Sequence, residues 1–83
     1  MKRTVVVADI SGKYGNPLAE LVQTACQFES EIFITSENKK INAKSIMGII
    51  AFNPNQGMEV NVLAEGKDEQ AALDAMERFL VCD

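Results

Sequence analysis

The chain has 83 residues, of which 47% are hydrophobic and 24% are charged. These proportions are those of an ordinary globular protein, so we expect residues 1–83 to form a single domain. The 8 basic and 12 acidic residues give a net charge of −4, which argues against direct nucleic-acid contacts and, more weakly, against an anionic membrane surface. The absence of histidine removes the commonest general base and transition-metal ligand, so we expect no enzymatic activity, no metal and no other cofactor.

Several features bear on location. No apolar run approaches the roughly 18 residues of a membrane span. A signal peptide is one interpretation of the basic N-terminus, but Asp9 interrupts the apolar segment and no small-residue cleavage site follows, which favours a first strand. Cys26 and Cys82 lack metal-site spacing and are too few for a disulfide scaffold. We therefore expect reduced thiols in the cytoplasm, with Cys26 in the core and Cys82 exposed.

The first third of the chain predicts a strand, a loop and a helix. Residues 3–8 are rich in β-branched side chains and predict the strand. The loop at residues 11–17 leads into a helix for which Asn16 is the expected N-cap and Pro17 the first helical residue. Apolar residues at helical spacing extend this helix to about Phe28; they are Leu18, Leu21, Val22, Ala25 and Cys26.

The middle of the chain predicts a hairpin and a short helix. Residues 31–35 and 40–43 read as two strands joined by a turn. Ser45 has the chemistry of an N-cap for a helix over residues 46–52. One short helix cannot turn all its apolar residues inward. We expect Ile49 and Phe52 to face the core and some of the others to stay exposed, namely Ile46, Met47 and Ile50.

The last third predicts a strand and a helix. Residues 58–64 alternate between apolar and polar side chains, with Leu63 as an apolar exception on the polar face. A final helix begins near Asp68, and we interpret Asp68 and Glu69 as capping acids rather than a catalytic pair. Its apolar stripe consists of Ala72, Leu73, Met76, Phe79 and Leu80.

The element order is thus β-α-β-β-α-β-α. Four strands and three helices predict an α+β fold, an open-faced two-layer sandwich in which three helices pack on one face of a mainly antiparallel four-stranded sheet.

Two positions in this order are candidates for chemistry. Tyr14 lies in an exposed loop, but no base accompanies it and its ordinary pKa is near 10, so we expect it to pack on the loop or a partner rather than to act as a nucleophile. Ser45 is either an ordinary N-cap or a phosphorylation site beside an apolar patch formed by Ile46, Met47 and Ile50. An exposed patch of this kind marks a partner site.

Four segments resemble HPr, the small phosphocarrier of the bacterial sugar phosphotransferase system. The strongest match is "INAKSIMGII" at residues 41–50, which is similar to the regulatory-serine motif of HPr proteins from some Gram-positive bacteria. "LVQTACQF", "GMEV" and "EGKDEQAAL" at residues 21–28, 57–60 and 65–73 also match. The resemblance covers essentially the whole chain and implies the HPr-like fold.

The loop departs from the family's Gly-x-His-Ala-Arg-Pro pattern. Aligned on Gly12 and Pro17, Tyr14 stands where the family has its phosphoaccepting histidine and Asn16 where it has an arginine that helps bind phosphate. The serine motif is intact. The resemblance therefore implies a Crh-type regulatory member, phosphorylated on Ser45 by HPr kinase/phosphorylase. The modified form would bind a CcpA-like transcription factor through Lys44, Ile46, Met47 and Ile50.

Three hypotheses follow from the sequence. The first is a non-enzymatic regulatory protein of carbon catabolite repression, controlled by phosphorylation of Ser45. The second is a phosphocarrier of sugar transport, against which the missing histidine argues. The third is a binding module with unrelated partners, in which Ser45 is only a helix cap.

Overall fold

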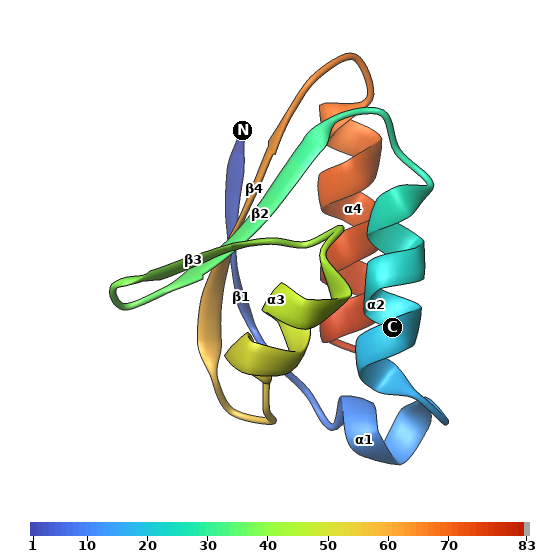
Figure 1. Ribbon diagram of the computed structural model, residues 1–83, viewed down its shortest axis with the longest axis vertical. Helices are drawn as coiled ribbons and strands as arrows, with labels where there is room; N and C mark the ends of the chain where they lie inside the picture. Colours follow the sequence, from blue (N-terminus) through green and yellow to red (C-terminus); the bar gives the residue numbers. More distant parts are fainter. Residues whose placement is uncertain (83) are drawn as a thin grey trace.

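The computed structural model describes residues 1–82 and has the predicted order of elements with one addition (Figure 1). The strands are β1 (Lys2–Val6), β2 (Glu31–Ser36), β3 (Lys39–Asn42) and β4 (Glu59–Glu65), and the helices are α1 (Ile10–Lys13), α2 (Pro17–Cys26), α3 (Ile46–Phe52) and α4 (Glu69–Leu80).

The addition is α1, a single helical turn over Ile10–Lys13 that takes up the first part of the predicted loop at residues 11–17. The carboxylate of Asp9 accepts a hydrogen bond from the backbone nitrogen of Gly12 at 3.0 Å, which caps the turn. Ile10 anchors the turn because its side chain is buried. Four residues are too few to show a helical period, so no sequence pattern indicated this element.

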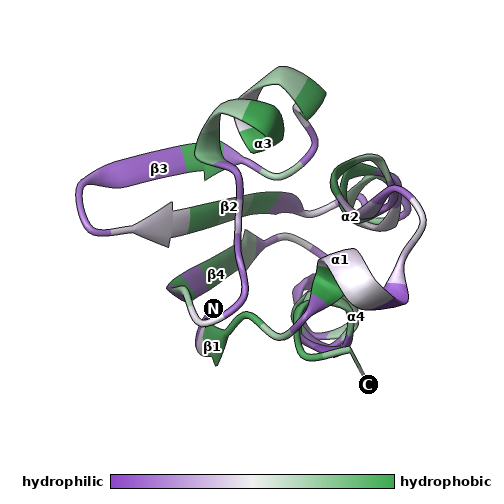
Figure 2. Ribbon diagram, turned by 90° about the horizontal axis from the view of Figure 1, so that it is seen from below, coloured by the Kyte–Doolittle hydropathy of each residue, from purple (hydrophilic) through white to green (hydrophobic). Residues whose placement is uncertain are grey.

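The sheet has the strand order β1-β4-β2-β3, and every neighbouring pair is antiparallel. Val5 pairs with Val60, and Ile34 pairs with Val62, so that the predicted inward-facing residues share one face. The helices pack on that face, with α2 and α4 lying alongside each other and α3 next to β3 (Figures 1 and 2). The predicted open-faced α+β sandwich is confirmed.

The core lies between this face and the helices. The whole predicted stripe of α4 is buried, and so are Leu21 and Ala25 of α2. The prediction for Cys26 is wrong, because its side chain is exposed. Each helical residue is rotated by about 100° from the one before, and Cys26 is therefore turned away from the face that buries Ala25. Cys82, expected to be exposed, is half-buried and packs against the core.

Asn16 and Asp68 occupy the predicted N-cap positions of α2 and α4, but neither side chain makes the expected capping hydrogen bond. The Asn16 side chain makes no capping hydrogen bond; instead, its backbone nitrogen donates to Oε2 of Glu20 at 3.0 Å. The Asp68 side chain does not cap α4. Its carboxylate accepts hydrogen bonds from the backbone nitrogens of Glu29 and Ser30, each at 2.9 Å, and from the Ser30 hydroxyl. The Asp68 carboxylate is thus bound by Glu29 and Ser30 instead of capping α4, whereas Asn16 contacts α2 through its backbone nitrogen.

The Asp68 contacts join the start of α4 to the start of β2. The hydrogen bond from the Ser30 hydroxyl, followed by that from the Glu29 backbone nitrogen, lowers the pKa of Asp68 to about 2. An ion pair holds β1 to the same helix, because Nη1 of Arg3 lies 2.6 Å from Oδ1 of Asp74 and 2.9 Å from Oε1 of Glu77. Within residues 1–82, no helix has the length and apolar character needed to cross a membrane.

Candidate functional site

Tyr14 contacts the C-terminal end of α4 rather than extending freely from its loop. Its ring stacks on that of Phe79 with 4.1 Å between the ring centroids and 3° between the planes. Its hydroxyl donates to the carbonyl oxygen of Phe79 at 3.2 Å. Burial, with smaller contributions from the charges of Cys82 and Glu20, raises the pKa of Tyr14 above its ordinary value. The phenol therefore stays protonated at neutral pH and is a poor nucleophile.

The residues beside Tyr14 also form hydrogen bonds within the chain. Nζ of Lys13 donates to the carbonyl oxygen of Cys82 at 2.7 Å, near the end of α4. At the start of α2, the backbone nitrogen of Asn16 is bound by the Glu20 carboxylate. A phosphoryl group approaching this loop would find the Asn16 backbone nitrogen already bound and one donor of the Lys13 ammonium engaged, and it would meet the negative charge of Glu20.

Ser45 lies in the turn between β3 and α3 and is exposed. Its backbone is extended, with φ of −101°, and Oγ accepts a hydrogen bond from the backbone nitrogen of Gly48 at 3.2 Å. The predicted N-cap is confirmed. A Cβ atom at position 48 would lie 3.4 Å from Oγ, which is an ordinary van der Waals contact.

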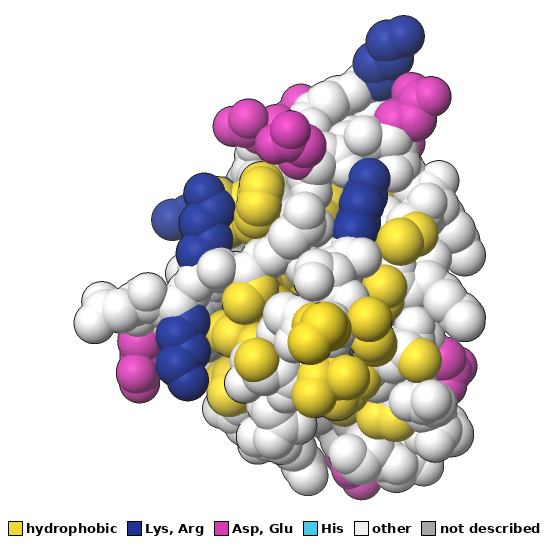
Figure 3. All heavy atoms as spheres, viewed as in Figure 1, with side chains coloured by type: hydrophobic (Ala, Val, Ile, Leu, Met, Phe, Trp, Pro, Cys, Tyr) yellow, Lys and Arg dark blue, Asp and Glu magenta, His cyan; other side chains and the backbone are white. Residues whose placement is uncertain are grey.

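The exposed apolar residues of α3 are those expected from its sequence. The exposed fractions are 41% for Ile46, 80% for Met47 and 56% for Ile50, whereas Ile49 and Phe52 are buried. We call Ile46, Met47 and Ile50 the α3 patch. Figure 3 shows hydrophobic side chains gathered over α3 and continuing toward α2, with acidic side chains nearer the edges of the view.

Lys44 makes two hydrogen bonds that the sequence did not indicate. Its Nζ donates to the carbonyl oxygen of Phe28 at 2.6 Å, and its backbone nitrogen donates to Oδ1 of Asn42 at 2.8 Å. The side chain is half-buried. Lys44 therefore joins the segment after α2 to the turn that holds Ser45.

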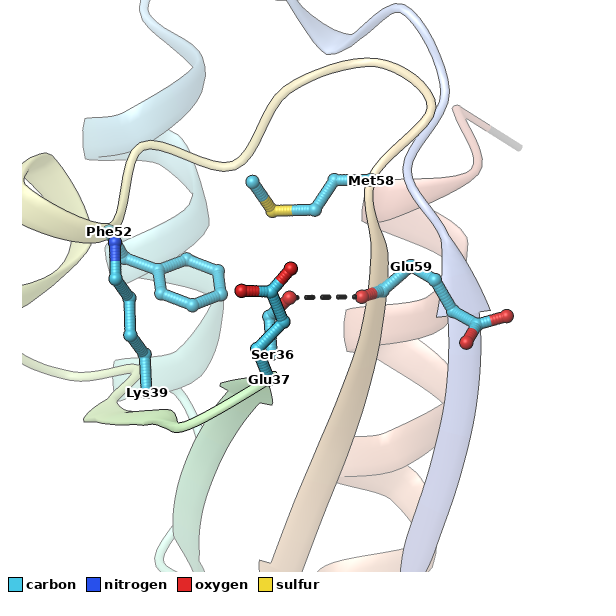
Figure 4. A pocket seen from close by; sticks show the side chains of 6 residues that line it. All are labelled: Ser36, Glu37, Lys39, Phe52, Met58 and Glu59. Atoms are coloured by element: carbon cyan, nitrogen blue, oxygen red, sulfur yellow. Dashed lines mark hydrogen bonds between the residues drawn. The ribbon is translucent and has the colours of Figure 1, made fainter.

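A cavity of about 430 Å³ next to α3 was not foreseen from the sequence. In Figure 4 the Phe52 ring and the Met58 side chain point toward the same space, and Oγ of Ser36 donates to the carbonyl oxygen of Glu59 at 3.3 Å. Three separate segments form this cavity, so no local pattern indicated it. Its lining consists of Ser36, Glu37, Lys39, Phe52, Met58 and Glu59.

Comparison with known proteins identifies the family. The model described as "PTS HPr component phosphorylation site" matches residues 1–81. The chain belongs to the HPr family. It is 42% identical over 77 residues to the phosphocarrier protein HPr of Treponema pallidum, covering 93% of this chain and 88% of that protein. It is 40% identical over 80 residues to the HPr-like protein Crh of Halalkalibacterium halodurans, covering 96% and 95%.

The structural comparison agrees with the sequence comparison. A crystal structure of HPr-C-His from Thermoanaerobacter tengcongensis superposes with a TM-score of 0.87 at 40% identity, covering 96% of this chain and 90% of that one. The predicted resemblance to HPr proteins and to Crh is therefore confirmed. The two kinds of relative match almost equally well, so family membership by itself does not distinguish a phosphocarrier from a regulator.

Proposed function

We propose that this protein is a regulatory HPr-like domain, residues 1–83, controlled by phosphorylation of Ser45 and acting through protein–protein contacts in carbon catabolite regulation. We propose that a cytoplasmic kinase of the HPr kinase/phosphorylase type phosphorylates Ser45. The proposed partner, or reader, that binds the phosphorylated form is a CcpA-like transcription factor. The α3 patch and Lys44 form the proposed contact surface. No catalytic residue of this chain takes part.

The observation that carries the proposal is the position of the Ser45 hydroxyl, which is exposed and immediately precedes the α3 patch. Phosphorylation would add a charge of about −1.5 to −2 and three acceptor oxygens beside exposed apolar side chains. A partner with a basic group next to an apolar groove would then bind the modified form more tightly. The capping bond to Gly48 contributes about 1 kcal/mol, so even its loss would leave the fold intact.

The surroundings of Tyr14 support a regulatory role over phosphate transfer. A carrier needs a group that accepts phosphate and then releases it, whereas a tyrosine phosphate ester is much less suited to onward transfer. The hydroxyl is bound to the Phe79 carbonyl oxygen, and Asn16 lacks the charged, bidentate fork of arginine. The donors of this loop thus stabilise the end of α4.

Incubation with HPr kinase/phosphorylase and ATP tests the proposal, with intact-mass and peptide mass spectrometry as the readout. We expect one phosphate on wild type, none on Ser45→Ala, and wild-type labelling of the control Ser11→Ala, which removes an exposed serine elsewhere. An unlabelled wild type, or equal labelling of Ser45→Ala, would contradict the proposal.

Binding of the phosphorylated chain to a CcpA-like protein tests the contact surface. Met47→Ser should weaken binding. Val6→Ser is the control and should not weaken binding, since Val6 is exposed and apolar like Met47 but lies on β1, outside the α3 patch. Equal effects of the two substitutions would argue against the α3 patch as the contact surface.

The second candidate is a phosphocarrier, which the family model and the Treponema relative favour. Incubation with enzyme I and phosphoenolpyruvate tests it: we expect no phosphate on the wild type. A double variant, Tyr14→His with Asn16→Arg, serves as a comparison with the family pattern. Labelling of the wild type would favour the carrier. The third possibility, a module with unrelated partners, would be favoured if Ser45→Asp changed no partner's affinity.

A further inference from the structure

Strand β3 forms one free edge of the sheet, because the strand order is β1-β4-β2-β3 (Figures 1 and 2). Just after β3, the backbone nitrogen of Ala43 donates to the carbonyl oxygen of Ile32 on β2 at 2.9 Å. Along an antiparallel strand, residues whose backbone groups bind the neighbouring strand alternate with residues whose groups point away from it. Counting back from Ala43, the backbone groups of Asn42 and Lys40 therefore point to the free edge.

Most of the backbone groups at this edge lack a partner. The carbonyl oxygen of Asn42 accepts a hydrogen bond from the backbone nitrogen of Ser45 at 3.0 Å. Within residues 1–82, no hydrogen bond engages the N–H and C=O of Lys40 or the N–H of Asn42. Groups of this kind on an edge strand bind an added strand, in the mode called β-augmentation. The edge thus offers, at Lys40, the pair of hydrogen bonds that an antiparallel strand completes.

A hollow of about 370 Å³ lies beside this edge, and we call it the β3 groove. It is lined by Lys39, Lys40 and Ile41 of β3 and by Ala51 and Phe52 of α3. Ile41 is half-buried and packs against the core, and Phe52 is buried. The groove is large enough to hold an apolar side chain, so an apolar floor lies next to the unpaired backbone groups.

The charges of the β3 groove are positive. Residues 39–44 contain three lysines and no acidic residue, although the whole chain has a net charge of −4. Nζ of Lys40 lies 4.6 Å from the centroid of the Phe33 ring, and no ion pair within residues 1–82 includes Lys39 or Lys40. Lysines on an edge strand oppose pairing with basic strands, and for the same electrostatic reason they favour an acidic one.

We propose that an extended, acidic segment of a partner protein adds to the free edge of β3. Antiparallel addition is the more stable arrangement, and residues opposite each other project to the same side of the sheet. The partner residue opposite Ile41 therefore enters the β3 groove and is apolar. The next two, opposite Lys40 and Lys39, are acidic. The partner segment thus contains an apolar residue followed by two acidic residues.

This contact goes beyond the proposed function, because neither the backbone groups of β3 nor its lysines depend on phosphorylation of Ser45. The contact is also short, since it involves three consecutive residues of β3. Interfaces of this size are weak, and we expect a dissociation constant of about 0.1–1 mM for an isolated peptide. A partner that carries the segment beside a second contact would bind more tightly.

Titration of the unphosphorylated protein with a synthetic peptide, followed through its amide NMR signals, tests the proposal. The probe is a short peptide with blocked ends in which valine-glutamate-glutamate lies between serines and threonines. We expect saturable shifts at the amides of Lys40 and Asn42, and none at Lys2 and Thr4 on β1, the opposite edge. No shifts up to about 5 mM peptide, or shifts confined to β1, would overturn the proposal.

Two altered peptides separate charge from strand pairing. Lysines in place of both glutamates should abolish binding. A methyl group on the backbone nitrogen of the first glutamate removes the N–H that would donate to the Lys40 carbonyl oxygen, and it should weaken binding by about tenfold. If the methylated peptide binds as well as the parent peptide, strand addition is overturned. If the basic peptide binds equally, the assignment of an acidic partner is overturned.

Matched lysine variants test the location of the site. Lys40→Glu and Lys39→Glu should each raise the dissociation constant of the acidic peptide by about fivefold or more. Lys2→Glu is the control and should bind like the wild type, since it makes the same change in charge on the opposite edge strand. The amide spectra also show whether each variant is folded. Equal weakening in all three variants would indicate general attraction to a less acidic protein and would overturn the proposed site.

Discussion

The Tyr14 loop precedes α2, and the Ser45 turn precedes α3. The polar groups of these two segments have different partners. In the first, the Tyr14 hydroxyl and the Lys13 ammonium bind carbonyl oxygens at the end of α4. In the second, the Ser45 hydroxyl stays exposed, with exposed apolar neighbours. A loop that stabilises its own chain has few groups left for a ligand, whereas an exposed turn is available for modification.

The comparison predicts that the two sites respond differently to mutation. Substitutions at the Tyr14 loop should act mainly on stability, and those at the Ser45 turn mainly on binding and modification.

The largest effect is expected for Tyr14→Ala, which removes the stack on Phe79 and the bond to its carbonyl oxygen. We expect the free energy of unfolding to fall by about 2–3 kcal/mol. Tyr14→Phe keeps the stack and should cost only about 0.5–1.5 kcal/mol. Urea denaturation measures both values. Equal losses in the two variants would show that the stack contributes little.

Acidification should weaken the contact that Asp68 makes at the other end of α4. The pKa of Asp68 is lowered to about 2 in the folded protein, so its stabilising contribution is complete above the ordinary aspartate pKa of about 4 and is lost as pH falls toward 2. Unfolding measured from pH 5 to pH 2 should show a smaller pH dependence in Asp68→Asn than in the wild type. Identical slopes would exclude this carboxylate as a source of the acid sensitivity.

Ser45→Ala should have a smaller effect on stability, because it removes one exposed capping bond to Gly48. We expect a loss of about 1 kcal/mol in the free energy of unfolding, together with complete loss of phosphorylation. Thermal unfolding and kinase labelling of the same preparation measure both. Ser45→Thr is the matched control, since its hydroxyl can still cap the helix. A loss as large as that of Tyr14→Ala would contradict the contrast between the two sites.

The smallest change in stability is expected for Met47→Ser. The Met47 side chain is 80% exposed, so the free energy of unfolding should change by less than about 0.5 kcal/mol. Its affinity for the reader of phosphorylated Ser45 should nevertheless fall. Calorimetric titration of the phosphorylated variant measures this affinity. Wild-type affinity at unchanged stability would remove Met47 from the proposed contact surface.

Much of this fold follows from local patterns. The alternation of Val60, Val62 and Ala64 and the stripe of α4 predicted buried faces that the structure confirms. The exposure of the α3 patch was also predictable, because seven helical residues present more apolar side chains than one face can bury. Both predictions depend only on neighbours close in sequence.

The contacts of Tyr14 and Asp68 were missed because distant segments decide them. Tyr14 meets Phe79 across 65 positions of the chain, and Asp68 meets Ser30 across 38. Cap propensity cannot predict that such partners will compete for a side chain. The pairing of Leu63 with Phe33 in the sheet likewise requires knowledge that β4 lies beside β2. Sequence patterns therefore indicated the Ser45 turn better than the Tyr14 loop.

Peptide mass spectrometry of the protein isolated from its native cells tests the central claim most directly, because it examines both sites in one measurement. The contrast between the open Ser45 turn and the closed Tyr14 loop predicts phosphate on the peptide that contains Ser45 and none on the peptide that contains Tyr14. Phosphate on Tyr14 with Ser45 unmodified would contradict the account.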